Sequence, residues 1–188
     1  MAADKKLVTV GKPKVGGGIY WAPAGTTPPT DATSALAEAF KCLGYVSEDG
    51  ITNQRENDEE IKAWGGDVVM RTMTDNFTYT LIEAMNVDVL KHVYGEDNVE
   101  GTLETGITIH ANSNAQEEGV LVVDQVFRGG VMKRIVVPRG QVTEVGEITY
   151  ADGEAVGYET TLLAAEDDEG NTHHEYIAKK PASGGAGG

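Results

Sequence analysis

The sequence has little cysteine, few aromatic residues and a shortage of positive charge. Of its 188 residues one is cysteine, 6% are Phe, Trp or Tyr, and 15 Lys and Arg stand against 30 Asp and Glu, for a net charge of -15. A single cysteine cannot form an internal disulfide, and Cys42 is interpreted as a small buried hydrophobe. The acidic excess argues against a typical nucleic-acid-binding protein, because such proteins contact phosphates through a basic surface.

Long apolar runs and catalytic motifs are also missing. No stretch approaches the roughly 20 apolar residues of a membrane span, and the N-terminus has no apolar signal-peptide region, so we expect assembly in a cytoplasm. The dinucleotide-binding and P-loop patterns are incomplete. The best metal candidate is His173-His174-Glu175, but adjacent strand residues point to opposite faces and are poorly placed to share one ion. We therefore expect no enzyme, no cofactor and no metal site.

What is present indicates an all-β (β-rich α+β) fold. Val, Thr and Ile dominate the ordered-looking segments, and 24 glycines can punctuate short strands. Residues 120–128 and 131–139 flank Gly129-Gly130, which predicts a tight hairpin. Two further hairpin signals are residues 148–150 leading into Asp152-Gly153, and residues 158–165 joined to 173–178. We expect a β-sandwich with one short flanking helix.

The flanking helix is predicted after Asn86, which can cap it. Val87, Leu90 and Tyr94 recur at helical spacing, and Gly95 can end the helix. A further helical turn is expected over residues 35–40.

Three regions are expected along the chain: an N-terminal docking arm over residues 1–15, a β-sandwich domain over 16–180 and a Gly-rich tail over 181–188. The arm is basic, with four lysines against one aspartate in the first twenty residues. It is too polar and Gly-rich to fold alone, so we expect it to dock on another subunit. The residues expected to dock are Lys5, Lys6, Leu7, Val8, Val10, Lys12 and Lys14.

Residues 47–60 carry many acidic side chains and almost no apolar ones, which predicts an exposed loop or long hairpin tip. Its charged residues are Glu48, Asp49, Arg55, Glu56, Asp58, Glu59 and Glu60. The next motif, Trp64-Gly65-Gly66, is interpreted as a strand with a mostly buried structural Trp64 and glycines at a bulge or turn. Close backbone approach to another subunit is the alternative role for the glycines.

Two stretches suggest a family. Residues 44–51 (GYVSEDGI), followed by the acidic segment and residues 61–69 (IKAWGGDVV), resemble the major tail (tail tube) proteins of long-tailed, siphovirus-type bacteriophages. The likeness extends from about residue 15 to 180. It implies a β-sandwich whose inner strands form the lumen of a ring of six subunits, with residues 2–15 as the arm and 47–60 as the loop between stacked rings.

The resemblance also implies function and partners. It implies a virion structural protein that polymerises into the tail tube, the conduit for double-stranded DNA, in contact with tape measure, tail terminator and distal tail proteins and with no membrane. A tail terminator, a head-to-tail connector and a contractile-injection tube protein share this plan and remain alternatives. A monomeric binding module is a more distant one, since only Tyr20 and Trp21 suggest an aromatic platform.

Overall fold

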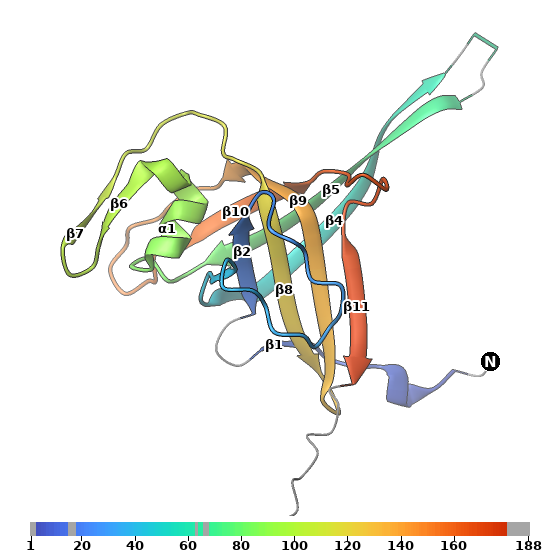
Figure 1. Ribbon diagram of the computed structural model, residues 1–188, viewed down its shortest axis with the longest axis horizontal. Helices are drawn as coiled ribbons and strands as arrows, with labels where there is room; N and C mark the ends of the chain where they lie inside the picture. The colour runs from blue at the N-terminus through green and yellow to red at the C-terminus, as the bar shows by residue number, and fades with distance from the viewer. Residues whose placement is uncertain (1–2, 15–17, 63, 66–67, 180–188) are drawn as a thin grey trace, which may run out of the picture.

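The computed structural model describes the backbone of residues 3–14, 18–62, 64, 65 and 68–179, and the fold is strand-rich (Figure 1). The predicted all-β class is confirmed. The strands are β1 (Lys12–Pro13), β2 (Ile19–Pro23), β3 (Lys41–Cys42), β4 (Val46–Lys62), β5 (Val68–Leu81), β6 (Val99–Thr102), β7 (Gly106–Ile109), β8 (Gly119–Phe127), β9 (Val131–Val145), β10 (Tyr158–Ala164) and β11 (His174–Lys179). The helical segments are α1 (Val87–Tyr94) and two 3-10 turns, η1 (Lys5–Leu7) and η2 (Glu96–Asn98).

Nine of these strands form one antiparallel sheet in the order β3-β2-β8-β9-β10-β5-β4, with β1 added to β8 and β11 added to β9. Strands β6 and β7 make a separate two-stranded ribbon beside α1. The large sheet curls, because residues from both of its halves line the same core cluster. Leu121 and Val137 enter this core from β8 and β9, while Phe77 and Leu162 enter it from β5 and β10.

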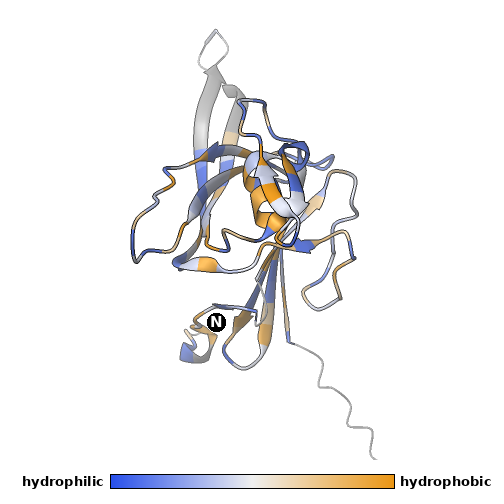
Figure 2. Ribbon diagram, turned by 90° about the vertical axis from the view of Figure 1, so that its left-hand side faces the viewer, coloured by the Kyte–Doolittle hydropathy of each residue, from blue (hydrophilic) through white to orange (hydrophobic). Residues whose placement is uncertain are grey.

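Helix α1 closes the core at one end of the sheet (Figure 2). It buries Val89, Leu90 and Val93, and burial of an aliphatic side chain of this size stabilises a fold by about 1.5–3 kcal/mol. The predicted caps are confirmed. The side chain of Asn86 accepts a hydrogen bond from the Asp88 amide, and the Gly95 amide donates to the Lys91 carbonyl with φ at 100°.

The opposite face of β2, β8 and β9 is covered by the connector, defined as residues 24–40 between β2 and β3. Phe40 and Leu36 of the connector pack against a second apolar cluster that includes Val120, Val122 and Val136. Strand β8 is therefore buried on both faces through residues 119–124. The helical turn expected over residues 35–40 does not form a helix, and a hydrogen bond from the Phe40 amide to the Ala37 carbonyl closes a turn instead.

The strong hairpin signal is confirmed. Strands β8 and β9 pair around Gly129 and Gly130, whose φ angles of 81° and 75° lie in the region that glycine adopts most easily. The other two predicted hairpins are wrong. Residues 148–150 are not a strand, although Gly153 does turn with a positive φ.

Strands β10 and β11 form where expected but do not pair with each other. Both pair with β9, β10 along residues 140–145 and β11 along residues 131–136. A strand of 15 residues is long enough to accept two shorter strands one after the other on the same edge. The segment between β10 and β11 is therefore a loop between two strands that pair with successive parts of β9.

Candidate assembly elements and their anchoring sites

A long hairpin leaves the body of the molecule (Figure 1). Strand β4 has 17 residues and pairs with β5. The acidic segment 47–60 is therefore one strand of a long hairpin, and the prediction that it forms a loop or the tip of a hairpin is wrong. The other neighbour of β5 in the sheet is β10, whose pairing with β5 ends at Leu163 opposite Asn76. Beyond Asn76 the hairpin is a two-stranded ribbon, which is marginally stable by itself in water.

Trp64 lies in the turn at the end of this ribbon and is fully exposed, so the prediction that it is a buried core residue is wrong. The reason is topological: β4 continues to Lys62, which places Trp64 and Gly65 in the turn at the tip of the hairpin. Gly65 has a φ of 110° and belongs to the turn. Gly66 lies outside the described residues.

A buried carboxylate lies where the ribbon leaves the body. Asp75 is fully buried and accepts hydrogen bonds from Asn53 of β4 at 2.5 Å and Thr172 at 2.5 Å. His173 Nδ1 lies 2.6 Å from Asp75 Oδ2, and Arg55 Nε lies 3.7 Å from the same oxygen. These contacts tie both strands of the ribbon to the loop between β10 and β11.

His173 and His174 therefore have different carboxylate partners. His173 faces Asp75, while His174 Nε2 lies 3.0 Å from Asp167. Backbone amides of Glu169 and Asn171 also donate to Asp167 and, with His174, lower the pKa of its carboxyl group. The two imidazoles are used to fasten the loop at two separate points.

The N-terminal arm lies along strand β8 of its own chain. Lys12 and Pro13 pair with Val126 and Gln125, and Thr9 Oγ1 accepts a hydrogen bond from the Arg128 amide at 3.1 Å. Three apolar residues of the arm, Leu7, Val8 and Val10, each keep about three quarters of their surface exposed. Contacts within the chain thus hold the arm through its backbone and the Thr9 hydroxyl, and leave these three apolar side chains largely exposed.

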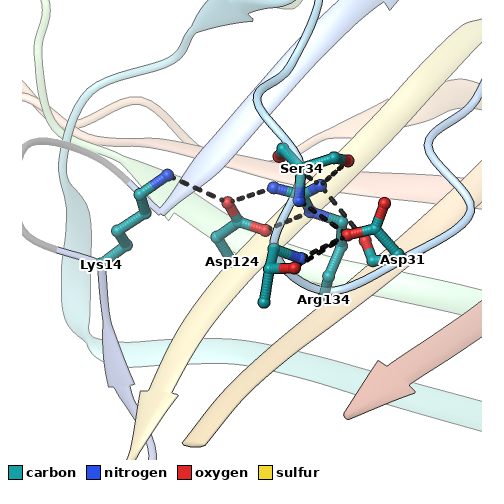
Figure 3. Close-up of polar contacts among 6 residues, drawn as sticks. Lys14, Asp31, Ser34, Asp124 and Arg134 are labelled. Carbon is teal, nitrogen blue, oxygen red and sulfur yellow. Dashed lines mark hydrogen bonds and ion pairs between the residues drawn. The ribbon is translucent and has the colours of Figure 1, made fainter. Parts of the chain in front are cut away.

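The root of the arm contacts a buried ion pair (Figure 3). Arg134 of β9 donates to Asp124 of β8 from Nε at 2.7 Å and from Nη2 at 2.9 Å, and both side chains are buried. Lys14 Nζ lies 3.4 Å from Asp124 Oδ2. Two hydrogen bonds in parallel to one carboxylate are the strong form of this interaction.

The same guanidinium holds the connector. Arg134 Nη1 donates to the carbonyls of Asp31 at 3.2 Å and Ser34 at 3.0 Å. The Asp31 carboxylate closes the local turn by accepting the amides of Thr33 and Ser34, and these bonds lower its pKa to about 2. Arg134 therefore joins the connector, the sheet and the arm root.

A neutral polar pair lies in the main core. His92 of α1 and the Tyr79 hydroxyl are 2.7 Å apart, and Trp21 contacts the imidazole edge-on with ring centroids 4.7 Å apart. Burial lowers the pKa of His92 to about 3 and raises the pKa of Tyr79. Both side chains are accordingly uncharged at neutral pH.

Sequence reasoning missed Asp75, Asp124, Arg134 and His92. A usable signal was present for two of them, since Asp124 follows four consecutive apolar residues and Arg134 precedes three. A charge inside an apolar strand is rarely buried without a partner. Of the predicted arm and loop residues, the structure brings Lys14 and Arg55 close to buried carboxylates, and it leaves Glu48, Asp49 and Glu56 exposed.

The remaining predicted assembly residues can be assigned to backbone elements only. Lys5 and Lys6 lie in η1, Asp58, Glu59 and Glu60 lie in β4, and the tail 181–188 is outside the described residues. Within the described residues no group of three or more His, Cys, Asp or Glu side chains could hold a metal ion. Helices long and apolar enough to cross a membrane are likewise not found in that part of the chain.

A comparison with protein families gives one decisive match. The model of the family described as phage tail tube protein matches residues 1–186. The chain belongs to this family. It is thus a structural protein of the phage tail, and the suspected tail tube relationship is confirmed. A comparison with curated proteins finds no match.

Proposed function

We propose that this tail tube protein polymerises as stacked rings, six subunits to a ring, into the conduit through which a siphovirus-type phage ejects its double-stranded DNA. The family match over residues 1–186 carries the proposal, because it covers the arm and the hairpin as well as the sheet. Tape measure, tail terminator and distal tail proteins are the proposed partners, and the host cytoplasm is the proposed place of assembly.

Strand β4 supports ring closure through its outer edge. It is the last strand of the sheet order, and its outer edge has no partner strand among the described residues. A free edge of this length is a template for pairing with another chain, and contacts between unlike surfaces close into a ring when the rotation allows it. Pairing of this edge with a neighbouring subunit would remove the aggregation hazard and build the ring in one step.

The hairpin and the arm support stacking. Trp64 is a large apolar side chain at the end of a projecting ribbon, and buried tryptophans commonly dominate the energy of protein interfaces. In the arm, exposed Leu7, Val8 and Val10 would bury their surface on an adjacent subunit, while its lysines would face an acidic body. Fixing a backbone residue costs about 1–2 kcal/mol, so charge attraction needs this apolar contribution.

Arm deletion tests the stacking role. Removal of residues 2–14 is expected to leave a soluble, β-rich protein that does not elongate into tubes under negative-stain microscopy. Reversal of Lys5, Lys6, Lys12 and Lys14 to Glu is expected to weaken assembly most at low salt, where charges are least screened. Tubes of normal length from the truncated protein would assign stacking to the hairpin alone.

Microscopy also separates the runner-up functions. Long polymers are expected of a tube protein, whereas single closed rings would indicate a tail terminator or connector. A protein that stays monomeric at every concentration would favour a binding module.

A further inference from the structure

The projecting hairpin loses the support of the sheet at one position. Strand β10 pairs with β5 only as far as Leu163, which lies opposite Asn76. From Asp75 outward, β4 is the one strand that pairs with β5 among the described residues. A two-stranded ribbon alone is marginally stable in water. The direction in which the hairpin leaves the body therefore depends on what holds the residues at this position.

Asp75 is the inward-facing residue of β5 at this position. Side chains alternate along a strand, so Asp75, Phe77 and Tyr79 share one face, and all three are buried. Phe77 and Tyr79 belong to the main core, whereas Asp75 lies one step nearer the tip of the hairpin. A charged side chain is rarely fully buried without partners. The groups that cover Asp75 therefore identify what holds the hairpin.

The cover comes from the loop between β10 and β11, residues 165–173, which we call the bracket loop. Figure 1 shows this loop beside the point where the hairpin leaves the body. Thr172 donates a hydrogen bond to Asp75 Oδ2 at 2.5 Å, and His173 Nδ1 lies 2.6 Å from the same oxygen. The His173 ring also meets Phe77 edge-on, with ring centroids 5.3 Å apart. One end of the bracket loop thus contacts both the core and the root of the ribbon.

The same carboxylate also holds the other strand of the hairpin. Asn53 of β4 donates to Asp75 Oδ1 at 2.5 Å and to the Asn76 carbonyl at 3.2 Å. Arg55 lies opposite Asp75 in the strand register, with its Nε 3.7 Å from Oδ2. Hydrogen bonds to a carboxylate are stronger than those between neutral groups. Asp75 therefore joins β4, β5 and the bracket loop at a single point.

The bracket loop is itself fixed to the body. At its start, Arg139 of β9 donates from Nη1 to the Glu166 carbonyl at 3.0 Å. Within it, the Asp167 carboxylate accepts the amides of Glu169 and Asn171 at 2.9 and 2.8 Å, a local turn that aspartate favours. At its end the chain continues into β11, which pairs with β9. A loop bonded in this way moves with the sheet and can act as a fixed support.

We propose that the bracket loop, acting through Asp75, holds the hairpin at one fixed angle to the body, with Thr172 and His173 as the positioning residues. The tip of the hairpin is then presented in place for a neighbouring subunit, a consequence that rests on the proposed function. An element that is ordered before binding loses less conformational freedom when it binds. The bracket loop thus favours assembly although it need not touch the neighbouring subunit.

The distance between two spin labels in the free chain tests the fixed angle. In a Cys42→Ser background, Glu56→Cys places one label on the ribbon just beyond the bracket loop, and Glu159→Cys places the other on β10 of the body. Both positions are exposed. Pulsed electron paramagnetic resonance, at concentrations below those that give tubes, measures the distribution of distances between the labels. We expect a single narrow distribution.

Substitutions in the bracket loop remove its contacts with the ribbon. Thr172→Val combined with His173→Gln should broaden the distance distribution without changing the circular dichroism spectrum, and Thr172→Val alone should broaden it less. Thr172→Ser, which keeps the hydroxyl, should leave it narrow. Asp75→Asn should also broaden it. Asp124→Asn is the matched control, because Asp124 is equally buried but lies at the root of the arm, and it should leave the distribution narrow.

A narrow distribution in both Asp75→Asn and the Thr172→Val, His173→Gln variant would overturn the proposal. A broad distribution in the labelled parent, or equal broadening in Asp124→Asn, would overturn it as well. Negative-stain microscopy of the unlabelled variants gives the second readout, and we expect the variants with broad distributions to lose long tubes. Normal tubes from those variants would overturn the role of the angle in assembly. Absence of tubes from the unmodified protein would contradict the proposed function, while the distances still decide on the bracket loop, so the two failures are distinguishable.

Discussion

Arg134 is the largest fully buried side chain in the described part of the chain, and its charge is compensated by Asp124. Truncation by Arg134→Leu leaves that carboxylate buried with only the partly exposed Lys14 ammonium near it, so the free energy of unfolding should fall by about 3–5 kcal/mol. Lys14 is 43% exposed, so Lys14→Ala should cost less than about 1 kcal/mol. Urea denaturation measures both. Equal losses of stability in the two variants would contradict the view that Arg134 is the main partner of Asp124. Adding Asp124→Leu to Arg134→Leu should recover part of the lost stability, because it removes the uncompensated carboxylate.

The buried, neutral His92 should make the stability of the fold sensitive to acid. Its pKa is about 3 in the folded chain against 6.5 for an ordinary histidine, so below pH 6.5 the unfolded state binds a proton that the folded state does not. The stability is complete above pH 6.5, and one such proton lowers the free energy of unfolding by about 1.4 kcal/mol per pH unit as the pH falls toward 3. His92→Gln should flatten this dependence between pH 6.5 and 4, whereas His110→Gln, at an exposed position, should not. An unchanged slope in His92→Gln would contradict the buried neutral state.

Trp64 should matter for assembly and not for folding. Because its side chain is fully exposed, Trp64→Ala should change the free energy of unfolding by no more than about 0.5 kcal/mol, yet shorten or abolish tubes. Tyr150→Ala, which removes another exposed aromatic side chain, is the matched control. Calorimetry and negative-stain microscopy give the two readouts, and a large loss of stability with normal tubes would return Trp64 to a structural role.

At the scale of elements, the hairpin can be shortened without changing strand register. Glu56 lies opposite Thr74, so an Asn-Gly turn can replace residues 57–73 and join the two strands directly. Asp75 and its contacts with Asn53 and His173 remain, so the shortened protein should keep its circular dichroism spectrum and cooperative unfolding. We expect it to form no long tubes. Tubes of normal length from the shortened protein would show that the hairpin is not needed for assembly.

Elements whose signals are local were predictable from the sequence. The Asn86 and Gly95 caps define α1, and Gly129-Gly130 defines the β8–β9 hairpin, because each depends on residues a few positions apart. Pairing over longer distances was not predictable. Strands β10 and β11 resemble a hairpin in sequence, and their separation depends on the length of β9, which accepts both.

The acidic segment shows a second limit of sequence reasoning. Residues 47–60 lack the apolar alternation of a half-buried strand, and residues 52–56 of β4 are exposed while their backbone pairs with β5. The burial of two carboxylates, Asp75 and Asp124, could not be predicted either, because their partners, His173 and Arg134, lie elsewhere in the sequence. Local composition therefore predicted exposure correctly at residues 48, 49 and 52–56, but it did not predict that the segment is a strand.

For the whole molecule, charge and architecture agree with a channel wall. The chain carries a net charge of -15, and identical copies that pack around an axis would surround DNA with a field that repels phosphate. The same charge opposes association of the copies, so the proposed assembly depends on the exposed apolar residues of the arm and on Trp64. Salt screens the repulsion between these acidic copies and should therefore promote assembly of the parent protein. The attraction between the basic arm and an acidic neighbour is screened as well, and it opposes this effect.

Negative-stain electron microscopy of the purified protein across a concentration series tests the account most directly. With rising concentration we predict long tubes of constant diameter with an open central channel, made of rings of six subunits. Monomers at every concentration, or closed single rings that never stack, would contradict the assignment of this chain as the repeating subunit of the tail tube.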